Sequence, residues 1–293
     1  MSSLFVSWLQ AARPWLELGR VSNLPTVWSN CLAAWLRGGG GSWGRFLAVC
    51  VGTSCVYVGG MFLNDACDER FDRRARSERP IPRGAVESRT VWRASAGVLG
   101  AGWLLLAMLG PTTAMLGGLL VVSVVVYDFT HKFVSFSPVT MALCRHLLYL
   151  VAGSAAWNGV VGDTVWSGLA LGAYVIGLSY IARGESVGGV PRWWSLPLLL
   201  APLGLAVFMN PFDAWGRSRM LMPVLILLIW TAKSLAELYR PGGGGAKTAV
   251  SGLLAGIVFV DVLATVPAPW PWGAAFLGFF GLALLLQRRV AAT

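Results

Sequence analysis

The sequence predicts an all-α integral membrane protein, a single domain over residues 1–293 in which a bundle of nine or ten transmembrane helices surrounds a central cavity. Of its residues, 56% are hydrophobic and only 12% are charged, against the ~25% charged residues of ordinary soluble domains. The apolar residues form long continuous runs, without the in-out alternation of a membrane β-strand. This composition excludes a soluble enzyme and a disordered chain.

A membrane-spanning helix needs about 20 mainly apolar residues, and ten segments of the chain meet or approach that length. We expect one or two of the ten to be half-helices. The expected spans lie near residues 21–36, 46–63, 91–109, 111–127, 138–157, 166–183, 194–209, 220–238, 248–266 and 270–287.

The chain carries 23 Lys and Arg residues against 13 Asp and Glu residues, a net charge of +10. Such a charge can indicate nucleic-acid binding in a soluble protein, but these basic residues lie mostly in short loops between apolar runs, so we expect membrane lipids and no nucleic acid as partners. Most of them fall at the N-terminus and in every second loop. Because loops rich in Lys and Arg stay in the cytoplasm, we expect the N-terminus and the charged loop of residues 64–84 to be cytoplasmic.

That loop, NDACDERFDRRARSERPIPRG, concentrates five acidic and six basic residues in 21 positions. A helix would place Asn64, Asp65, Asp68 and Asp72 on adjoining rows of one face. Carboxylates so arranged repel one another unless a cation lies among them, and Mg²⁺ prefers a few carboxylates together with substrate phosphate oxygens. The pattern predicts a metal diphosphate site, with nearby arginines on the phosphates. The alternative is a solvated charged loop that only anchors the topology.

The order N-D-x-x-D-x-x-x-D followed by R-P-I-P-x-G, from Asn64 to Gly84, resembles the first aspartate-rich motif of the UbiA family of intramembrane prenyltransferases. The resemblance implies a helical bundle, Mg²⁺ as cofactor, and an isoprenoid diphosphate and an unidentified acceptor as partners. Two further segments are similar to the family. Gly19–Asn30 resembles its N-terminal segment, with Arg20 and Asn23 facing the cavity, and YDFTHK resembles the loop in which Tyr127 and Lys132 approach the pyrophosphate.

The chain departs from the family at its second aspartate-rich motif, roughly D-x-x-Y-A-x-x-D. Tyr180 keeps the tyrosine, but Gly177 and Gly184 stand where the aspartates are expected, with Glu185 beside the second. Three outcomes are compatible with this change: Glu185 supplies one carboxylate and Arg183 replaces the charge of a second metal ion on the diphosphate, the protein binds an isoprenoid diphosphate without ionising it, or the substrate is a different one. Two metal ions with full carboxylate ligation are not expected, and this variant resembles the EboC-like branch of the family.

Arg145 and Asp261 are ionisable residues inside apolar spans, where charge normally faces a polar cavity or a partner. Arg145 is a candidate contact for a diphosphate or carboxylate. Asp261 marks a cavity or a proton path, and Lys233 and Arg145 are its candidate partners.

The sequence thus predicts Mg²⁺-dependent transfer of a prenyl group from an isoprenoid diphosphate to an aromatic or other nucleophilic acceptor. The alternative is non-catalytic binding or transport of a lipid-like metabolite within a membrane assembly. A secondary transporter would require inverted repeats. The expected catalytic residues are Asp65, Asp68 and Lys132; the substrate-binding residues are Arg20, Asn23, Arg79, Tyr127, Arg145, Tyr180 and Arg183; the metal ligands are Asn64, Asp65, Asp68, Asp72 and Glu185.

Overall fold

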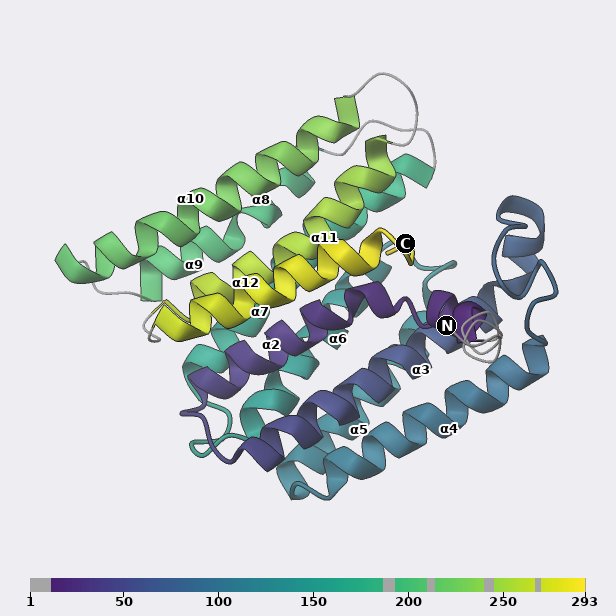
Figure 1. Ribbon diagram of the computed structural model, residues 1–293, viewed down its shortest axis with the longest axis horizontal. Coiled ribbons are helices and arrows are strands. Elements are labelled where there is room, and N and C mark those ends of the chain that lie inside the picture. Colours follow the sequence, from purple (N-terminus) through teal and green to yellow (C-terminus); the bar gives the residue numbers. More distant parts are fainter. Residues whose placement is uncertain (1–11, 187–192, 210–213, 240–244, 267–269, 293) are drawn as a thin grey trace, which may run out of the picture.

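The computed structural model describes residues 12–186, 193–209, 214–239, 245–266 and 270–292, and these ranges contain helices and no β-strand. The all-α membrane fold is confirmed (Figure 1). The elements in chain order are η1 (Val21–Asn23), α2 (Leu24–Arg37), α3 (Trp43–Ala75), α4 (Ser88–Ala107), α5 (Pro111–Thr130), α6 (Ser137–Ser154), α7 (Gly162–Ser186), η2 (Trp193–Ser195), α8 (Leu196–Leu199), α9 (Ala201–Met209), α10 (Ala214–Ala236), η3 (Glu237–Tyr239), α11 (Gly245–Ala264) and α12 (Trp270–Gln287).

Among the described helices, six are long and apolar enough to cross a membrane, namely α3, α4, α5, α7, α11 and the helical stretch Arg219–Tyr239 that includes most of α10. The span expected over residues 194–209 is divided into η2, α8 and α9. Pro197 and Pro202 account for this division, because proline has no backbone N–H to donate and is tolerated only near the start of a helix. A continuous apolar run was therefore a poor guide to helix length here.

Helix α3 is much longer than the span expected over residues 46–63. It has 33 residues, about 50 Å at 1.5 Å per residue, whereas the hydrocarbon core of a bilayer is about 30 Å thick. One uninterrupted helix thus crosses the membrane and continues through the whole acidic pattern up to Ala75.

Helix α2 lies in the middle of the bundle and contacts α3, α6, α11 and α12, while α3 packs mainly against α4 and α10 against α11 (Figure 1). The α3–α4 contact is close because small residues face each other. A Cβ on Gly102 would lie 2.8 Å from the carbonyl oxygen of Gly52, and one on Gly59 would lie 2.8 Å from Leu99. Such glycines allow two membrane helices to approach closely, which fixes the position of the acidic end of α3.

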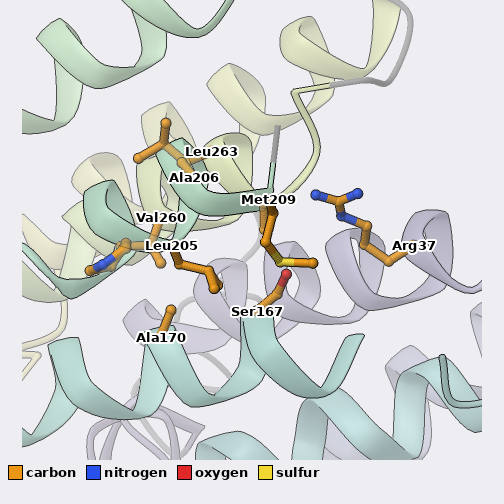
Figure 2. A pocket seen from close by; sticks show the side chains of 10 residues that line it. Arg37, Ser167, Ala170, Leu205, Ala206, Met209, Val260 and Leu263 are labelled. Carbon is orange, nitrogen blue, oxygen red and sulfur yellow. The ribbon is translucent and has the colours of Figure 1, made fainter. Parts of the chain in front are cut away.

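A small pocket, partly open to the outside, lies between α2, α7, α9 and α11 (Figure 2). Its lining includes Arg37, Ser167 and otherwise apolar or small side chains, with no carboxylate among the described lining residues. Arg37, at the last turn of α2, donates to Asp163 at 3.1 Å. The pocket therefore lies at the end of α2 opposite to Arg20, away from the acidic face of α3.

Candidate active site

The acidic face of α3 is buried. Asn64, Asp65, Asp68 and Asp72 are each less than one-tenth exposed. They lie on one continuous helix, as the spacing predicted. Buried carboxylates need compensating charge or hydrogen-bond donors, and the structure supplies it from segments outside α3.

Two arginines hold the first and last carboxylates of this face. Arg20 Nη2 lies 3.1 Å from Asp65 Oδ1 and 3.2 Å from Asn64 Oδ1. Arg79 Nη1 lies 2.9 Å from Asp65 Oδ1 and 3.1 Å from Asp72 Oδ2. Arg79 thus joins two carboxylates that are separated by two turns of the helix.

The positions of both arginines follow from local structure. After α3 the chain folds back, and Ile81 of the R-P-I-P sequence packs into a small apolar cluster with Phe62 and Val91. This packing returns Arg79 to the helix it has just left. Arg20 has a φ of 42°, and no other described non-glycine residue has a positive φ. Non-glycine residues in this region are uncommon, and backbone strain of this kind concentrates at functional sites.

Asp68 is contacted from the segment that follows α5. Its Oδ1 lies 2.7 Å from Lys132 Nζ and 3.3 Å from His131 Nε2. The Nδ1 atom of His131 lies 3.1 to 3.2 Å from the carbonyl oxygens of Asp128 and Tyr127. Since both ring nitrogens face acceptors, the hydrogen bond to Asp68 raises the pKa of His131 and favours the imidazolium form.

Asp128 is a member of the cluster that the sequence reasoning missed. Its side chain is 3% exposed, and its Oδ1 accepts a hydrogen bond from Asn64 Nδ2 at 3.1 Å. Its Oδ2 is buried without a hydrogen-bond partner in the described part of the chain. Its signal in the sequence is a carboxylate in the last turn of an apolar span, inside the YDFTHK sequence in which the family resemblance points only to Tyr127 and Lys132.

The end of α7 contacts the segment after α5. Arg183 donates to the carbonyl oxygens of Ser135 at 2.7 Å and His131 at 2.9 Å, and also to Ser137 Oγ. Tyr180 OH donates to the Ser135 carbonyl at 3.5 Å. In the structure these side chains therefore support the 131–137 loop. The sequence instead predicts that Arg183 contacts the diphosphate. The side chain of Glu185, an expected metal ligand, lies outside the described residues.

The ring of Tyr127 stacks on that of His131, with centroids 5.2 Å apart. Asn23, expected to face the cavity, is 4% exposed; its Nδ2 donates to Tyr57 OH at 3.2 Å and to the Ala292 carbonyl at 2.9 Å. The C-terminal segment therefore lies beside η1, as Figure 1 also shows. Tyr127 is thus attached to the acidic cluster through His131, whereas Asn23 is tied to the C-terminal segment.

Arg145 belongs to a second polar cluster. Its Nη1 donates to Asn30 Oδ1 at 2.7 Å and its Nη2 to Thr26 Oγ1 at 3.2 Å. No carboxylate lies within 4 Å of its guanidinium in the described chain. Arg145 is connected to Asp261 through Asn30 and not directly. Lys233, the other expected partner of Asp261, instead lies over the ring of Trp230 at 5.2 Å.

Asp261 is fully buried and both its oxygens accept hydrogen bonds. Oδ2 accepts from Ser29 at 2.5 Å and Asn30 at 2.7 Å, and Oδ1 accepts from Tyr149 at 2.6 Å. These donors come from α2 and α6, so the carboxylate joins three helices. No open cavity or proton path is needed to explain it.

The donor chemistry of the α3 cluster fits a divalent cation. Carboxylate and amide oxygens are the ligands that Mg²⁺ prefers, and Asp72 Oδ1 and Asp128 Oδ2 are buried without a hydrogen-bond partner. Among the described residues, however, no three His, Cys, Asp or Glu side chains converge as they would around one metal ion. Basic side chains lie between the carboxylates instead.

The UbiA prenyltransferase family model matches residues 22–292, which is nearly the whole chain. The chain belongs to the UbiA prenyltransferase family. The resemblance in the first aspartate-rich motif is thus confirmed at the level of the family, and the EboC-like branch stays a prediction.

Similar proteins agree with this UbiA assignment. A digeranylgeranylglyceryl phosphate synthase from Metallosphaera sedula is 44% identical over 64 residues, which span only 22% of this chain and 22% of that protein. A solved structure of digeranylgeranylglyceryl phosphate synthase has a TM-score of 0.59 at 18% identity, over 94% of this chain and 99% of the other. A UbiA homolog from Archaeoglobus fulgidus bound to GPP and Mg²⁺ has a TM-score of 0.52 at 13% identity, over 93% and 98%. These two structures share the fold.

Proposed function

We propose that this UbiA-family protein transfers a prenyl group from an isoprenoid diphosphate to a nucleophilic acceptor in the membrane, and that the reaction depends on Mg²⁺. The observation that carries the proposal is the buried cluster at the end of α3, in which Asp65, Asp68 and Asp72 meet Arg20, Arg79 and Lys132. Both kinds of charge that a metal diphosphate requires are present at one place.

The cluster can exchange its partners. Buried ion pairs gain little net stability, because desolvation of the two charges offsets their attraction. Phosphate oxygens can take the guanidinium and ammonium donors of Arg20, Arg79 and Lys132. The carboxylates of Asp65 and Asp68 are then left to bind the cation. Ligand binding would thus replace each internal ion pair with two new ones, between a basic side chain and phosphate and between a carboxylate and the cation.

When bound, Mg²⁺ would neutralise charge on the leaving pyrophosphate. Lys132 and the two arginines would hold the phosphate oxygens as negative charge develops on them. The bond from C1 of the isoprenoid to its bridging oxygen breaks and pyrophosphate leaves with the electron pair. A nucleophilic atom of the acceptor bonds to C1, and its proton passes to pyrophosphate or water. The apolar helices around the cluster would limit access of water to the reacting carbon.

The solved UbiA homolog from Archaeoglobus fulgidus supports the ligand class, because it shares this fold and is bound to GPP and Mg²⁺. The Metallosphaera sedula relative, a digeranylgeranylglyceryl phosphate synthase, supports the type of reaction over the 64 matched residues. The excess of Lys and Arg at the N-terminus and in alternate loops supports an arrangement in which the acidic end of α3 faces the cytoplasm.

A second candidate function is binding or transport of the diphosphate without cleavage. It is favoured by the end of α7, where Gly177 and Gly184 replace the expected aspartates and the Arg183 guanidinium contacts the 131–137 loop. The cluster on α3 would then bind the headgroup only.

The proposal is tested in membrane vesicles from cells that overproduce the protein, since native membranes supply candidate acceptors. We expect Mg²⁺-dependent release of pyrophosphate from added geranylgeranyl diphosphate, lost on chelation with EDTA. Asp65→Ala removes the carboxylate shared by Arg20 and Arg79, and we expect it to lower the rate by roughly 10²–10³-fold.

The matched control is Asp163→Ala, a carboxylate paired with Arg37 at the opposite end of α2, which should leave the rate unchanged. Equal rates in the Asp65→Ala variant and the unchanged protein would refute the assignment of the site. Binding of the diphosphate without any release would establish the second candidate function.

A further inference from the structure

We propose that Asp128, in the last turn of α5, is a further ligand of the divalent cation and takes the place of the carboxylates missing from the end of α7. This inference rests on the proposed function of the α3 cluster. In this arrangement α3 and α5 both contribute ligands to the site, and the hydrogen bond between Asn64 of α3 and Asp128 of α5 joins the two helices.

The first argument is charge. Asp65, Asp68 and Asp72 each have a carboxylate oxygen within 4 Å of at least one basic side chain, but no basic nitrogen lies within 4 Å of the Asp128 carboxylate oxygens in the described chain, and His131 contacts only the Asp128 backbone carbonyl. Asp128 is nevertheless only 3% exposed. A buried carboxylate without a direct ion pair is costly, and a bound cation would supply one.

The second argument is the unused oxygen. Asp261 is equally buried and also lacks an ion pair, but three donors occupy its two oxygens. Asp128 has a single side-chain donor, Asn64 Nδ2 on Oδ1, and its Oδ2 has none. The two buried carboxylates therefore differ in kind, since one is fully hydrogen-bonded and the other keeps a free coordination position.

The third argument is location. Asn64 contacts Asp128 through its Nδ2 and Arg20 through its Oδ1. His131, one turn after Asp128, contacts Asp68. The end of α5 is thus joined to the acidic face of α3 at two neighbouring turns, by Asp128 at Asn64 and by His131 at Asp68. Carboxylates contributed by two packed helices are a common way to build a cation site inside a bundle.

The fourth argument is that the end of α7 is closed to a carboxylate at position 177. A Cβ on Gly177 would lie 2.7 Å from the Ser195 carbonyl oxygen and 3.2 Å from Leu198. An aspartate there would require η2 and α8 to move. Beyond this point Tyr180 and Arg183 contact the 131–137 loop. In this chain the end of α7 therefore supports the segment after Asp128.

The experiment measures metal affinity without turnover. Mn²⁺ is titrated into the full-length protein in nanodiscs, in the presence of the slowly cleaved probe geranylgeranyl thiodiphosphate, and bound Mn²⁺ is counted by electron paramagnetic resonance. We expect Asp128→Asn, which keeps the shape and the contact to Asn64, to weaken Mn²⁺ binding by at least about tenfold. Asp128→Glu should retain binding with an altered Mn²⁺ spectrum. Asp163→Asn should match the unchanged protein.

The outcomes separate the two proposals. If the unchanged protein binds no Mn²⁺ with the probe, the proposed function fails and this inference fails with it. If Asp65→Ala weakens binding but Asp128→Asn does not, the site stands and the role of Asp128 is refuted. Thermal unfolding of each variant shows whether it is folded. Should Asp128→Asn unfold, an unchanged Mn²⁺ spectrum in a folded Asp128→Glu variant would refute the role of Asp128 by itself.

Discussion

The bundle contains two buried polar clusters in which the carboxylates are compensated differently. Around Asp261, neutral donors from Ser29, Asn30 and Tyr149 occupy both carboxylate oxygens. At the end of α3, charged groups from separate segments face the carboxylates, and oxygens of Asp72 and Asp128 stay without donors. In the first cluster every carboxylate oxygen has a hydrogen-bond donor without a ligand, whereas in the second some carboxylate oxygens remain available to a cation. We infer that the first stabilises the fold and the second binds substrate.

The largest effect is expected from Lys132→Ala, which tests whether the cluster at the end of α3 binds substrate. Lys132 Nζ lies 2.7 Å from Asp68, and in the proposed reaction it moves to a phosphate oxygen. We expect pyrophosphate release to fall by roughly 10²–10³-fold while the protein stays folded. Lys233→Ala is the matched control, because Lys233 lies over Trp230. An equal loss in both variants would mean that Lys132 has no special place in the reaction.

The next largest effect is expected from Asp261→Ala, measured as the free energy of unfolding in detergent. Removal of this carboxylate leaves the donors of Tyr149 and Asn30 buried and unpaired, at a cost of about 3 kcal/mol, whereas the Ser29 hydroxyl keeps the Thr26 carbonyl oxygen as an acceptor. Addition of Mg²⁺ with geranylgeranyl diphosphate should raise the free energy of unfolding of the Asp261→Ala variant by no more than that of the unchanged protein. Asp163→Ala, which breaks an ion pair whose carboxylate is half exposed and whose arginine side chain is 14% exposed, should cost about 1 kcal/mol. Similar costs for the two variants would contradict a structural role for Asp261.

The smallest effect is expected from Arg183→Gln. This change weakens the contact between α7 and the 131–137 loop, so Lys132 and His131 would be held less firmly. We expect a loss of about tenfold in affinity for the metal diphosphate, as is typical of side chains that support a ligand-binding group, with kcat changed less than KM. A fall in kcat with KM unchanged would instead place Arg183 on the reacting diphosphate.

The sequence predicted the face of α3 because helical spacing alone decides which side chains share a row. Asn64, Asp65, Asp68 and Asp72 needed no knowledge of tertiary structure. The family resemblance added Arg20, Arg79 and Lys132, which the structure places within 3.1 Å of those carboxylates. Their roles in binding and catalysis stay predictions.

Other features depended on contacts between distant segments. The sequence shows Asp128 as a carboxylate at the end of an apolar run, but its membership of the cluster depends on the packing of α5 against α3. The closed position at Gly177 depends on Ser195, which follows the end of α7 by several residues. For the interrupted span over residues 194–209 the sequence does contain local signals, Pro197 and Pro202, but its continuous hydrophobicity alone predicts one unbroken helix.

The uninterrupted length of α3 has a consequence for the membrane around it. Because one rigid helix carries both the lipid-embedded residues and the acidic face, the depth of the carboxylates relative to the headgroups is set by how that helix matches the bilayer. A thicker bilayer would draw the acidic turns closer to the hydrocarbon or change the tilt of the helix, and a thinner one would expose them to water. Lipid composition thereby becomes a physical control over how easily a charged headgroup reaches the cluster.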